Sequence, residues 1–165
     1  MTDEQLIEIF KKMMETLKKS HLYRNTSRVI SAFPGTGKTI YFQRSKFKKV
    51  LDSDSSKFDK QYFPENYIEH IKESLNDLSI YKIFVSSHKT VREALVKHNI
   101  AFTLIYPERE LKEEYIKRYE NRGNTPEFVA LVDKNWDSWL DELDNQEGCD
   151  KIKLKAGEFI GDVLA

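Results

Sequence analysis

The stretch RVISAFPGTGKT, residues 28–39, decides the fold. It opens with an apolar, β-rich run over 28–33, passes through a turn at 34–37, and leads into a segment over 38–46 that can form a helix. A strand, a glycine turn and a helix in this order are the context in which the pattern (A/G)xxxxGK(S/T) forms a phosphate-binding (Walker A) loop. We therefore predict that the chain binds a nucleoside triphosphate here.

Each residue type in this loop suits that task. Gly35 and Gly37 permit backbone angles closed to other residues, so that successive N–H groups can point inward and hold an anion. Lys38 can bridge the β- and γ-phosphates, and the Thr39 hydroxyl can bind Mg²⁺. Ala32 stands where such loops usually begin with glycine, a substitution that they tolerate. The pattern predicts a bound nucleoside triphosphate and Mg²⁺, with Pro34, Gly35, Thr36, Gly37, Lys38 and Thr39 as the nucleotide-binding residues.

Strands and helices alternate along the rest of the chain. Further strands are expected at 47–51, 81–85, 101–106 and 151–154, and further helices at 64–78, 89–98, 108–121 and 126–143. Alternation of this kind predicts a largely parallel sheet with right-handed crossovers and helices on both faces. Ligands of such sheets bind beyond the carboxyl ends of the strands, so the segments after each strand are the ones to examine for chemistry.

The composition limits the classes of function. The 165 residues suit one domain, and 27 basic against 27 acidic residues argue against a specific nucleic-acid partner. No apolar run approaches the roughly 18 residues of a membrane span, and the N-terminus lacks the order of a signal peptide. Cys149 is the only cysteine, so an internal disulfide is excluded. We expect one cytoplasmic domain with no membrane partner; the sequence does not specify the oligomeric state.

An amphipathic helix is expected in the N-terminal segment 1–20. Leu6, Phe10, Met13 and Leu17 recur at helical spacing over residues 3–19. The simplest interpretation is a helix packed on the domain, and the alternative is a docking element for a partner or a membrane.

The loop and the order of elements resemble the small P-loop kinases, which include nucleoside monophosphate, shikimate and gluconate kinases. The resemblance covers about residues 28–160. It implies a three-layer α/β domain whose five-stranded parallel sheet has the order 2-3-1-4-5. It also implies an acceptor bound opposite ATP and an arginine-bearing lid at about residues 107–125.

Two carboxylates, Asp52 and Asp54, end the second predicted strand. Mg²⁺ prefers oxygen ligands, and a carboxylate beside an incoming hydroxyl can take its proton. The resemblance implies that Asp52 helps to hold Mg²⁺ and that Asp54 contacts the acceptor. If the acceptor is a nucleotide phosphate, Asp54 would instead hold a sugar hydroxyl. The alternative is a solvated acidic turn.

Ser86, Ser87 and His88 follow the third predicted strand, and Arg92 lies on the helix after it. The segment is similar to the gluconate-kinase pattern, so Ser86, His88 and Arg92 are predicted to bind the acceptor. An arginine can pair with an anionic acceptor through two hydrogen bonds. The alternatives are a surface role for His88 and a surface charge beside Glu93 for Arg92.

Arg118 and Arg122 share one face of the predicted helix 108–121. The resemblance places lid arginines in this part of the chain, where a guanidinium can stabilise the transferring phosphoryl group. Arg109 is a weaker candidate. The alternative is a solvated helix whose arginines pair with its glutamates.

The predicted function is ATP-dependent phosphoryl transfer to a small-molecule acceptor by a kinase of the nucleoside monophosphate type. Asp54 and the serine-rich strand end keep open a second reading, a kinase acting on a hydroxyl of a sugar or sugar acid. A third reading is a P-loop NTPase or nucleotide-regulated binding module, although the third and fourth strands lack the terminal acidic residue of such proteins. On any of the three, Lys38 and Thr39 bind nucleotide and metal.

Overall fold

A computed structural model describes residues 1–20, 26–46 and 48–164 of the chain. Its centre is a five-stranded sheet in which all neighbouring strands are parallel and follow the order β2-β3-β1-β4-β5. The predicted strand order is therefore confirmed. The strands are β1 (Val29–Ala32), β2 (Lys49–Asp52), β3 (Ile80–Ser86), β4 (Phe102–Pro107) and β5 (Asp150–Leu154).

The helices lie close to their predicted positions. They are α1 (Asp3–Ser20), α2 (Lys38–Arg44), α3 (Glu65–Asn76), α4 (Lys89–Lys97), α5 (Lys112–Asn121), α6 (Pro126–Asp144) and α7 (Ile160–Val163). Short 3-10 turns occupy Ser55–Lys57 and Arg109–Leu111, so α5 begins later than expected. Neither Ser55–Lys57 nor α7 was predicted, because both are too short to show periodicity. Phe47, the first residue of the predicted second strand, lies outside the described residues.

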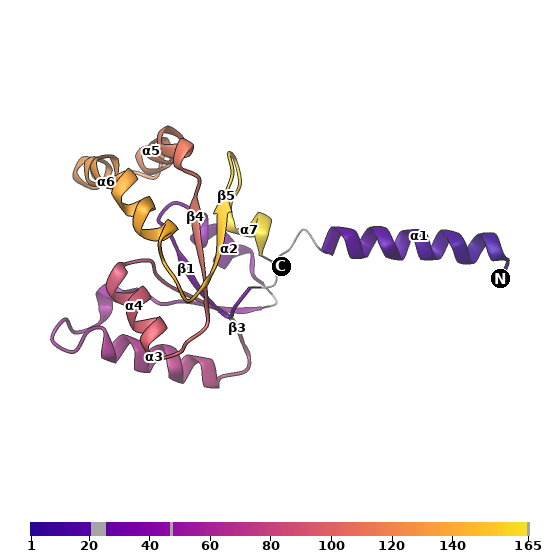
Figure 1. The fold of residues 1–165 in the computed structure, drawn as a ribbon, viewed down its shortest axis with the longest axis horizontal. Helices are drawn as coiled ribbons and strands as arrows, with labels where there is room; N and C mark the ends of the chain where they lie inside the picture. Colours follow the sequence, from indigo (N-terminus) through magenta and orange to yellow (C-terminus); the bar gives the residue numbers. More distant parts are fainter. Residues whose placement is uncertain (21–25, 47, 165) are drawn as a thin grey trace.

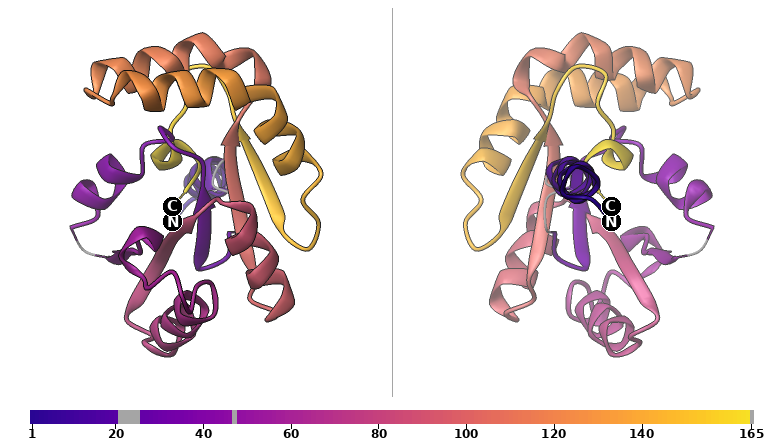
Figure 2. Two further views of the ribbon diagram at one scale, coloured as in Figure 1. Left: turned by 90° about the vertical axis from the view of Figure 1, so that its left-hand side faces the viewer. Right: turned by 90° about the vertical axis from the view of Figure 1, so that its right-hand side faces the viewer.

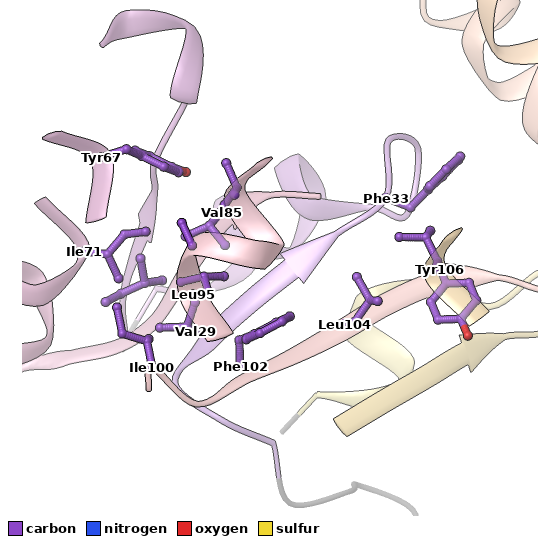
Figure 3. Close-up of a cluster of buried hydrophobic side chains, with 14 of the residues drawn as sticks. Val29, Phe33, Tyr67, Ile71, Val85, Leu95, Ile100, Phe102, Leu104 and Tyr106 are labelled. Carbon is purple, nitrogen blue, oxygen red and sulfur yellow. The ribbon is translucent and has the colours of Figure 1, made fainter. Parts of the chain in front are cut away.

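The sheet separates two buried apolar clusters. Successive residues of β1 point to opposite faces, so Val29 joins one cluster and Ile30 the other. The larger cluster lies beneath α3, α4, α5 and α6, and Figure 3 shows its aromatic and branched side chains meeting over β1, β3 and β4. The smaller cluster lies on the face covered by α2 and α7. The prediction of helices on both faces is confirmed.

The central strand β1 positions the phosphate-loop segment. Hydrogen bonding to β3 on one side and β4 on the other fixes β1, and Ala32 lies beside Ser86 and Ile105. Figure 1 shows α5 and α6 together in the upper part of the domain and α3 and α4 together in the lower part, and Figure 2 shows the same two groups from the sides. The loop after β1 therefore lies between the end of β3 and the segment that leads into α5.

Helix α1 does not pack on the domain, which corrects the simpler interpretation of its apolar stripe. Its side chains at Leu6, Phe10 and Met13 are each more than half exposed, and Figure 1 shows the helix projecting away from the sheet. Apolar periodicity specifies which face of a helix could be buried, but not what covers it. Among the described residues, no helix is both long and apolar enough to cross a membrane.

Deleting residues 1–20 should leave the sheet domain intact. Among residues 3–14, whose side chains the structure describes, none contributes to either buried cluster. The melting temperature should therefore change by less than about 3 °C, as measured by circular dichroism. A larger fall would show that α1 packs on the domain in solution.

Candidate functional site

The loop after β1 has a backbone that requires glycine at two positions. Gly35 and Gly37 adopt φ angles of 84° and 93°, which side chains rarely tolerate. A Cβ atom on Gly35 would lie 2.8 Å from a ring carbon of Tyr119, and one on Gly37 would lie 2.8 Å from a ring carbon of Phe159. Backbone conformation and close packing thus both require glycine at these two positions. A loop whose main chain approaches phosphates has the same requirement.

Hydrogen bonds from three elements hold this loop. The buried Thr36 hydroxyl donates to Phe33 O at 2.7 Å, and Thr36 O accepts from Ile160 N at 2.8 Å. The Tyr119 hydroxyl donates to Pro34 O at 2.7 Å. Because its hydroxyl is used inside the protein, Thr36 can offer a nucleotide only its main chain. The loop is therefore held by hydrogen bonds from α7 and from α5.

A cavity of about 850 Å³ opens at the carboxyl ends of β1, β2 and β3. Most of the predicted site residues line it: Pro34, Gly35, Gly37, Lys38, Thr39, Asp52, Asp54, Ser86, His88, Arg118 and Arg122. The other lining residues were not among the predicted site residues: Ala32, Phe33, Ile40, Ser53, Ser55, Ser87, Asn121 and Phe159. Of the predicted residues, Thr36 and Arg92 are not part of the lining. One cavity therefore joins the phosphate-loop segment to the acidic strand end and the α5 arginines.

The two aspartates after β2 have different surroundings. Asp52 pairs with Lys38 at 3.3 Å between Oδ1 and Nζ. Asp54 Oδ1 accepts from Ser56 N at 2.9 Å. Hydrogen bonds from the Ser56 hydroxyl and N–H, with smaller contributions from Lys57 and Lys38, lower the pKa of Asp54 below its usual value. Asp54 is therefore an ionised carboxylate that can accept a hydrogen bond or a proton.

Tyr67 of α3 ties the ends of β2 and β3 together beneath the cavity. Its buried hydroxyl donates to Ser53 O at 2.7 Å and accepts from Ser86 N at 3.3 Å. Burial raises the pKa of Tyr67, so the hydroxyl keeps its proton. His70, one turn further along α3, lies 2.9 Å from the Ser53 hydroxyl. The sequence places Tyr67 within the predicted helix 64–78 but does not reveal this role, because the carbonyl of Ser53 that it meets is fourteen positions away.

Arg118 braces the loop. Its Nη1 donates to Gly35 O at 2.8 Å, and its guanidinium lies between the rings of Tyr115 and Phe159, 4.3 and 4.0 Å from their centroids. Arg122, by contrast, is exposed at the cavity edge, 5.8 Å from the Tyr119 ring centroid. Both predicted lid arginines thus face the cavity, and only Arg118 is held in the loop's hydrogen-bond network.

Arg109 lies outside the cavity lining. It pairs with Asp137 at 3.0 Å and also with Asp141 and Asp144, all three on α6. This weaker candidate is therefore a link between the end of β4 and α6, and the structure does not support it as a site residue.

The structure does not support Arg92 as an acceptor ligand. Its side chain is 4% exposed, and its donors are occupied by Ser87 O at 2.8 Å, Gln146 Oε1 at 2.6 Å and Glu142 Oε2 at 3.2 Å. Instead of reaching a ligand, Arg92 fastens the strand end before α4 to the end of α6. Local sequence could not reveal this, since Glu142 and Gln146 lie about fifty positions away.

Replacing Arg92 by alanine should destabilise the protein by about 2–3 kcal/mol, because the buried Ser87 carbonyl and the Gln146 amide lose a charged donor. Urea unfolding measures the change. Lys89→Ala is the control, since its pair with Glu93 is exposed and 3.9 Å long, and its loss should cost less than about 0.5 kcal/mol. Unchanged stability together with a lost acceptor affinity would restore Arg92 as a ligand.

Comparisons with models of known protein families, with curated proteins and with solved structures found no match to this chain. Its function must therefore be inferred from the residues that line the cavity.

Proposed function

We propose that this protein transfers the terminal phosphoryl group of ATP to a small-molecule acceptor. The observation that carries the proposal is the shared cavity, in which a glycine cradle, two strand-end carboxylates and two arginines from α5 face one another. A phosphate loop alone would suit many nucleotide-binding proteins. Here the loop and the Asp54 carboxylate line the same cavity, and this combination favours transfer of a phosphoryl group to an acceptor.

The loop would hold the triphosphate. The left-handed backbone at Gly35 and Gly37 leaves no room for a Cβ atom, and the N-terminus of α2, which begins at Lys38, favours negative charge. Lys38 is about one-third exposed and can exchange Asp52 for phosphate oxygens. The exposed Thr39 and the Asp52 carboxylate supply the oxygen ligands that Mg²⁺ prefers. Bound Mg²⁺ would supply charge neutralisation for the transferring phosphoryl group.

Asp54 would face the acceptor. The acceptor oxygen forms a bond to the γ-phosphorus while the bond from that phosphorus to the β–γ bridging oxygen breaks, so that ADP leaves. The proton of an acceptor hydroxyl passes to the Asp54 carboxylate, which is ionised because of its hydrogen bonds from Ser56. Correct placement of the two reactants supplies much of the rate.

Arg118 of α5 and Arg122 at its C-terminal cap would stabilise the phosphoryl group during its transfer. Arg122 is exposed at the cavity edge and is free to approach the phosphates. Arg118 donates to Gly35 O of the loop, so its guanidinium could turn to a phosphate oxygen of a nucleotide held by the same loop. We include in the proposal a closing movement of about residues 107–125, which would exclude water as a competing acceptor.

Product analysis with ATP and Mg²⁺ tests the proposal. A kinase forms ADP strongly only when a suitable acceptor is present, whereas a switch or motor hydrolyses ATP without one. Calorimetric titration of ATP measures nucleotide binding separately. ATP binding with acceptor-independent ADP formation would replace the kinase by an NTPase, and a lack of ATP binding would contradict the phosphate-loop assignment itself.

A further inference from the structure

We propose that the acceptor is a neutral polyol, such as an unphosphorylated sugar, that presents a hydroxyl group to Asp54. This inference rests on the proposed phosphoryl transfer and narrows its acceptor. It comes from the residues that line the cavity after β2 and β3, which include Asp54, several serines and His88 but, within the described lining, no lysine or arginine.

The cationic end belongs to the nucleotide. Among the described residues that line the cavity, the permanent cations are Lys38, Arg118 and Arg122. Lys38 begins the helix after the phosphate loop, and Arg118 donates to the loop carbonyl of Gly35. All three are therefore placed to meet the triphosphate of ATP.

The opposite end is negative. It is formed after β2 and β3 by two aspartates and several serines, with His88 as its one titratable base within the described lining. Asp54 contributes a carboxylate to this part of the lining, whereas Asp52 pairs with Lys38 at 3.3 Å and is the residue proposed to hold Mg²⁺. Lys57 influences the charge of Asp54 but does not line the cavity.

The N-terminus of α4 is the one feature near Asp54 and the serines that favours an anion, and its positive charge is smaller than the negative charge of the Asp54 carboxylate. Helix α4 begins beside His88, which caps it without a side-chain hydrogen bond. The N-terminus of a helix carries the equivalent of about half a positive charge. The full negative charge of the Asp54 carboxylate outweighs that half charge, so a phosphate group placed beside Asp54 would be repelled.

The arginine that could have bound an acceptor phosphate points into the protein. Arg92 donates to Ser87 O, Gln146 and Glu142 and is buried. Its position in the sequence suits a phosphate ligand, yet its donors are occupied. The acceptor end therefore lacks the guanidinium that recognition of a monophosphate calls for.

The remaining groups suit hydroxyls. The carboxylate of Asp54 can accept hydrogen bonds from hydroxyl groups, and Ser55, Ser86 and Ser87 can both donate and accept. The aromatic rings in the described lining, Phe33 and Phe159, belong to the loop after β1 and to the segment after β5. The acceptor end thus offers no broad ring on which a nucleobase could stack, so a polyol fits it better than a nucleoside.

Acceptor-dependent ADP formation with matched pairs of compounds tests this inference. The panel contains ribose, glucose and glycerol, each beside its phosphate esters, and nucleosides beside their 5′-monophosphates. Sugar 1- and 6-phosphates are both included, so that a blocked hydroxyl is not mistaken for repulsion. For at least one polyol, kcat/KM should exceed that of each of its phosphate esters by at least about 100-fold, because like charges placed together disfavour binding strongly.

The Lys38→Ala protein serves as the control, since ADP that it still forms would come from a contaminating kinase. A nucleoside or a monophosphate that outperforms every polyol would overturn the inference and leave the proposed kinase function standing. A panel in which no polyol is phosphorylated would also overturn it. Calorimetric binding of ATP to the same preparation then tells whether the proposed nucleotide site has failed as well.

Discussion

Replacing Lys38 by alanine is expected to lower acceptor-dependent ADP formation by about 1,000-fold, the loss typical of removing one preorganised charged donor from a reacting centre. Lys38 stands at the first position of α2, where its ammonium group shares the cavity with the glycine cradle. Without it, the β- and γ-phosphates lose a cation in both the ground state and the transition state. ATP affinity should therefore fall together with turnover.

The fold should survive this substitution. Lys38 contributes to neither buried cluster, and its described ion pair is the half-exposed one with Asp52. Circular dichroism checks the fold, steady-state kinetics the turnover, and calorimetry the affinity for ATP. Lys134→Ala, on the exposed side of α6 and outside the cavity lining, is the matched control and should behave as the wild type. Undiminished turnover by Lys38→Ala would reject the phosphate-loop assignment.

Replacing Asp54 by asparagine should reduce kcat by about 100- to 1,000-fold, in the range of a lost general base. Asparagine keeps an oxygen that can accept from Ser56 N, so the turn after β2 should persist. It carries no negative charge and cannot take the proton of an acceptor hydroxyl. The affinity for ATP should change by less than about 3-fold, since Asp54 is proposed to contact the acceptor and not the nucleotide.

The pH dependence gives a second measurement of Asp54. Its pKa is lowered in the folded protein, so the charged form is present at neutral pH and is lost only as the pH falls through that lowered value. The wild-type kcat/KM should therefore show no loss from Asp54 protonation between about pH 5 and pH 8. A base titrating inside that window would point to another group, with His88 as the first candidate.

Asp59→Asn is the control for Asp54→Asn. Asp59 lies in the same exposed loop, accepts from Gln61 N at 2.9 Å, and does not line the cavity. Its substitution should leave kcat unchanged. Equal and large losses of ATP affinity and turnover in Asp54→Asn would move Asp54 from the acceptor to the metal.

Local patterns predicted the sheet and most of the cavity. The strand–turn–helix over residues 28–46 placed the phosphate loop, the alternation of elements predicted a largely parallel sheet, and the resemblance to the small P-loop kinases implied the strand order that the structure has. Asp52, Asp54, Ser86 and His88 could be found in the sequence because they follow strands, and parallel strands bring their carboxyl ends to one edge. Fold class and the location of the cavity were therefore accessible before any coordinates.

Side-chain orientation and long-range partners were not accessible in this way. Arg92 and Arg118 both read as arginines on helices near the site, yet one fastens Ser87 to the end of α6 and the other faces the phosphate loop. The apolar stripe of α1 predicted burial and is exposed instead. The orientation of Arg92 and Arg118 depends on hydrogen-bond partners far away in the sequence. The exposure of α1 reflects the absence of a packing partner among the described residues.

The sequence by itself determined the alternation of strands and helices, the glycine turn after the first strand and the acidic residues after β2, since these depend on periodicity and on backbone angles set by neighbouring residues. Only the tertiary structure decided which charges face the cavity. Arg92 does not line the cavity because it donates to Glu142 and Gln146. Tyr67 links the ends of β2 and β3 through its hydrogen bonds with Ser53 and Ser86. The physical reason is that a charged side chain is held by whichever partner folding brings within hydrogen-bond distance, and that partner is not encoded in the residues beside it.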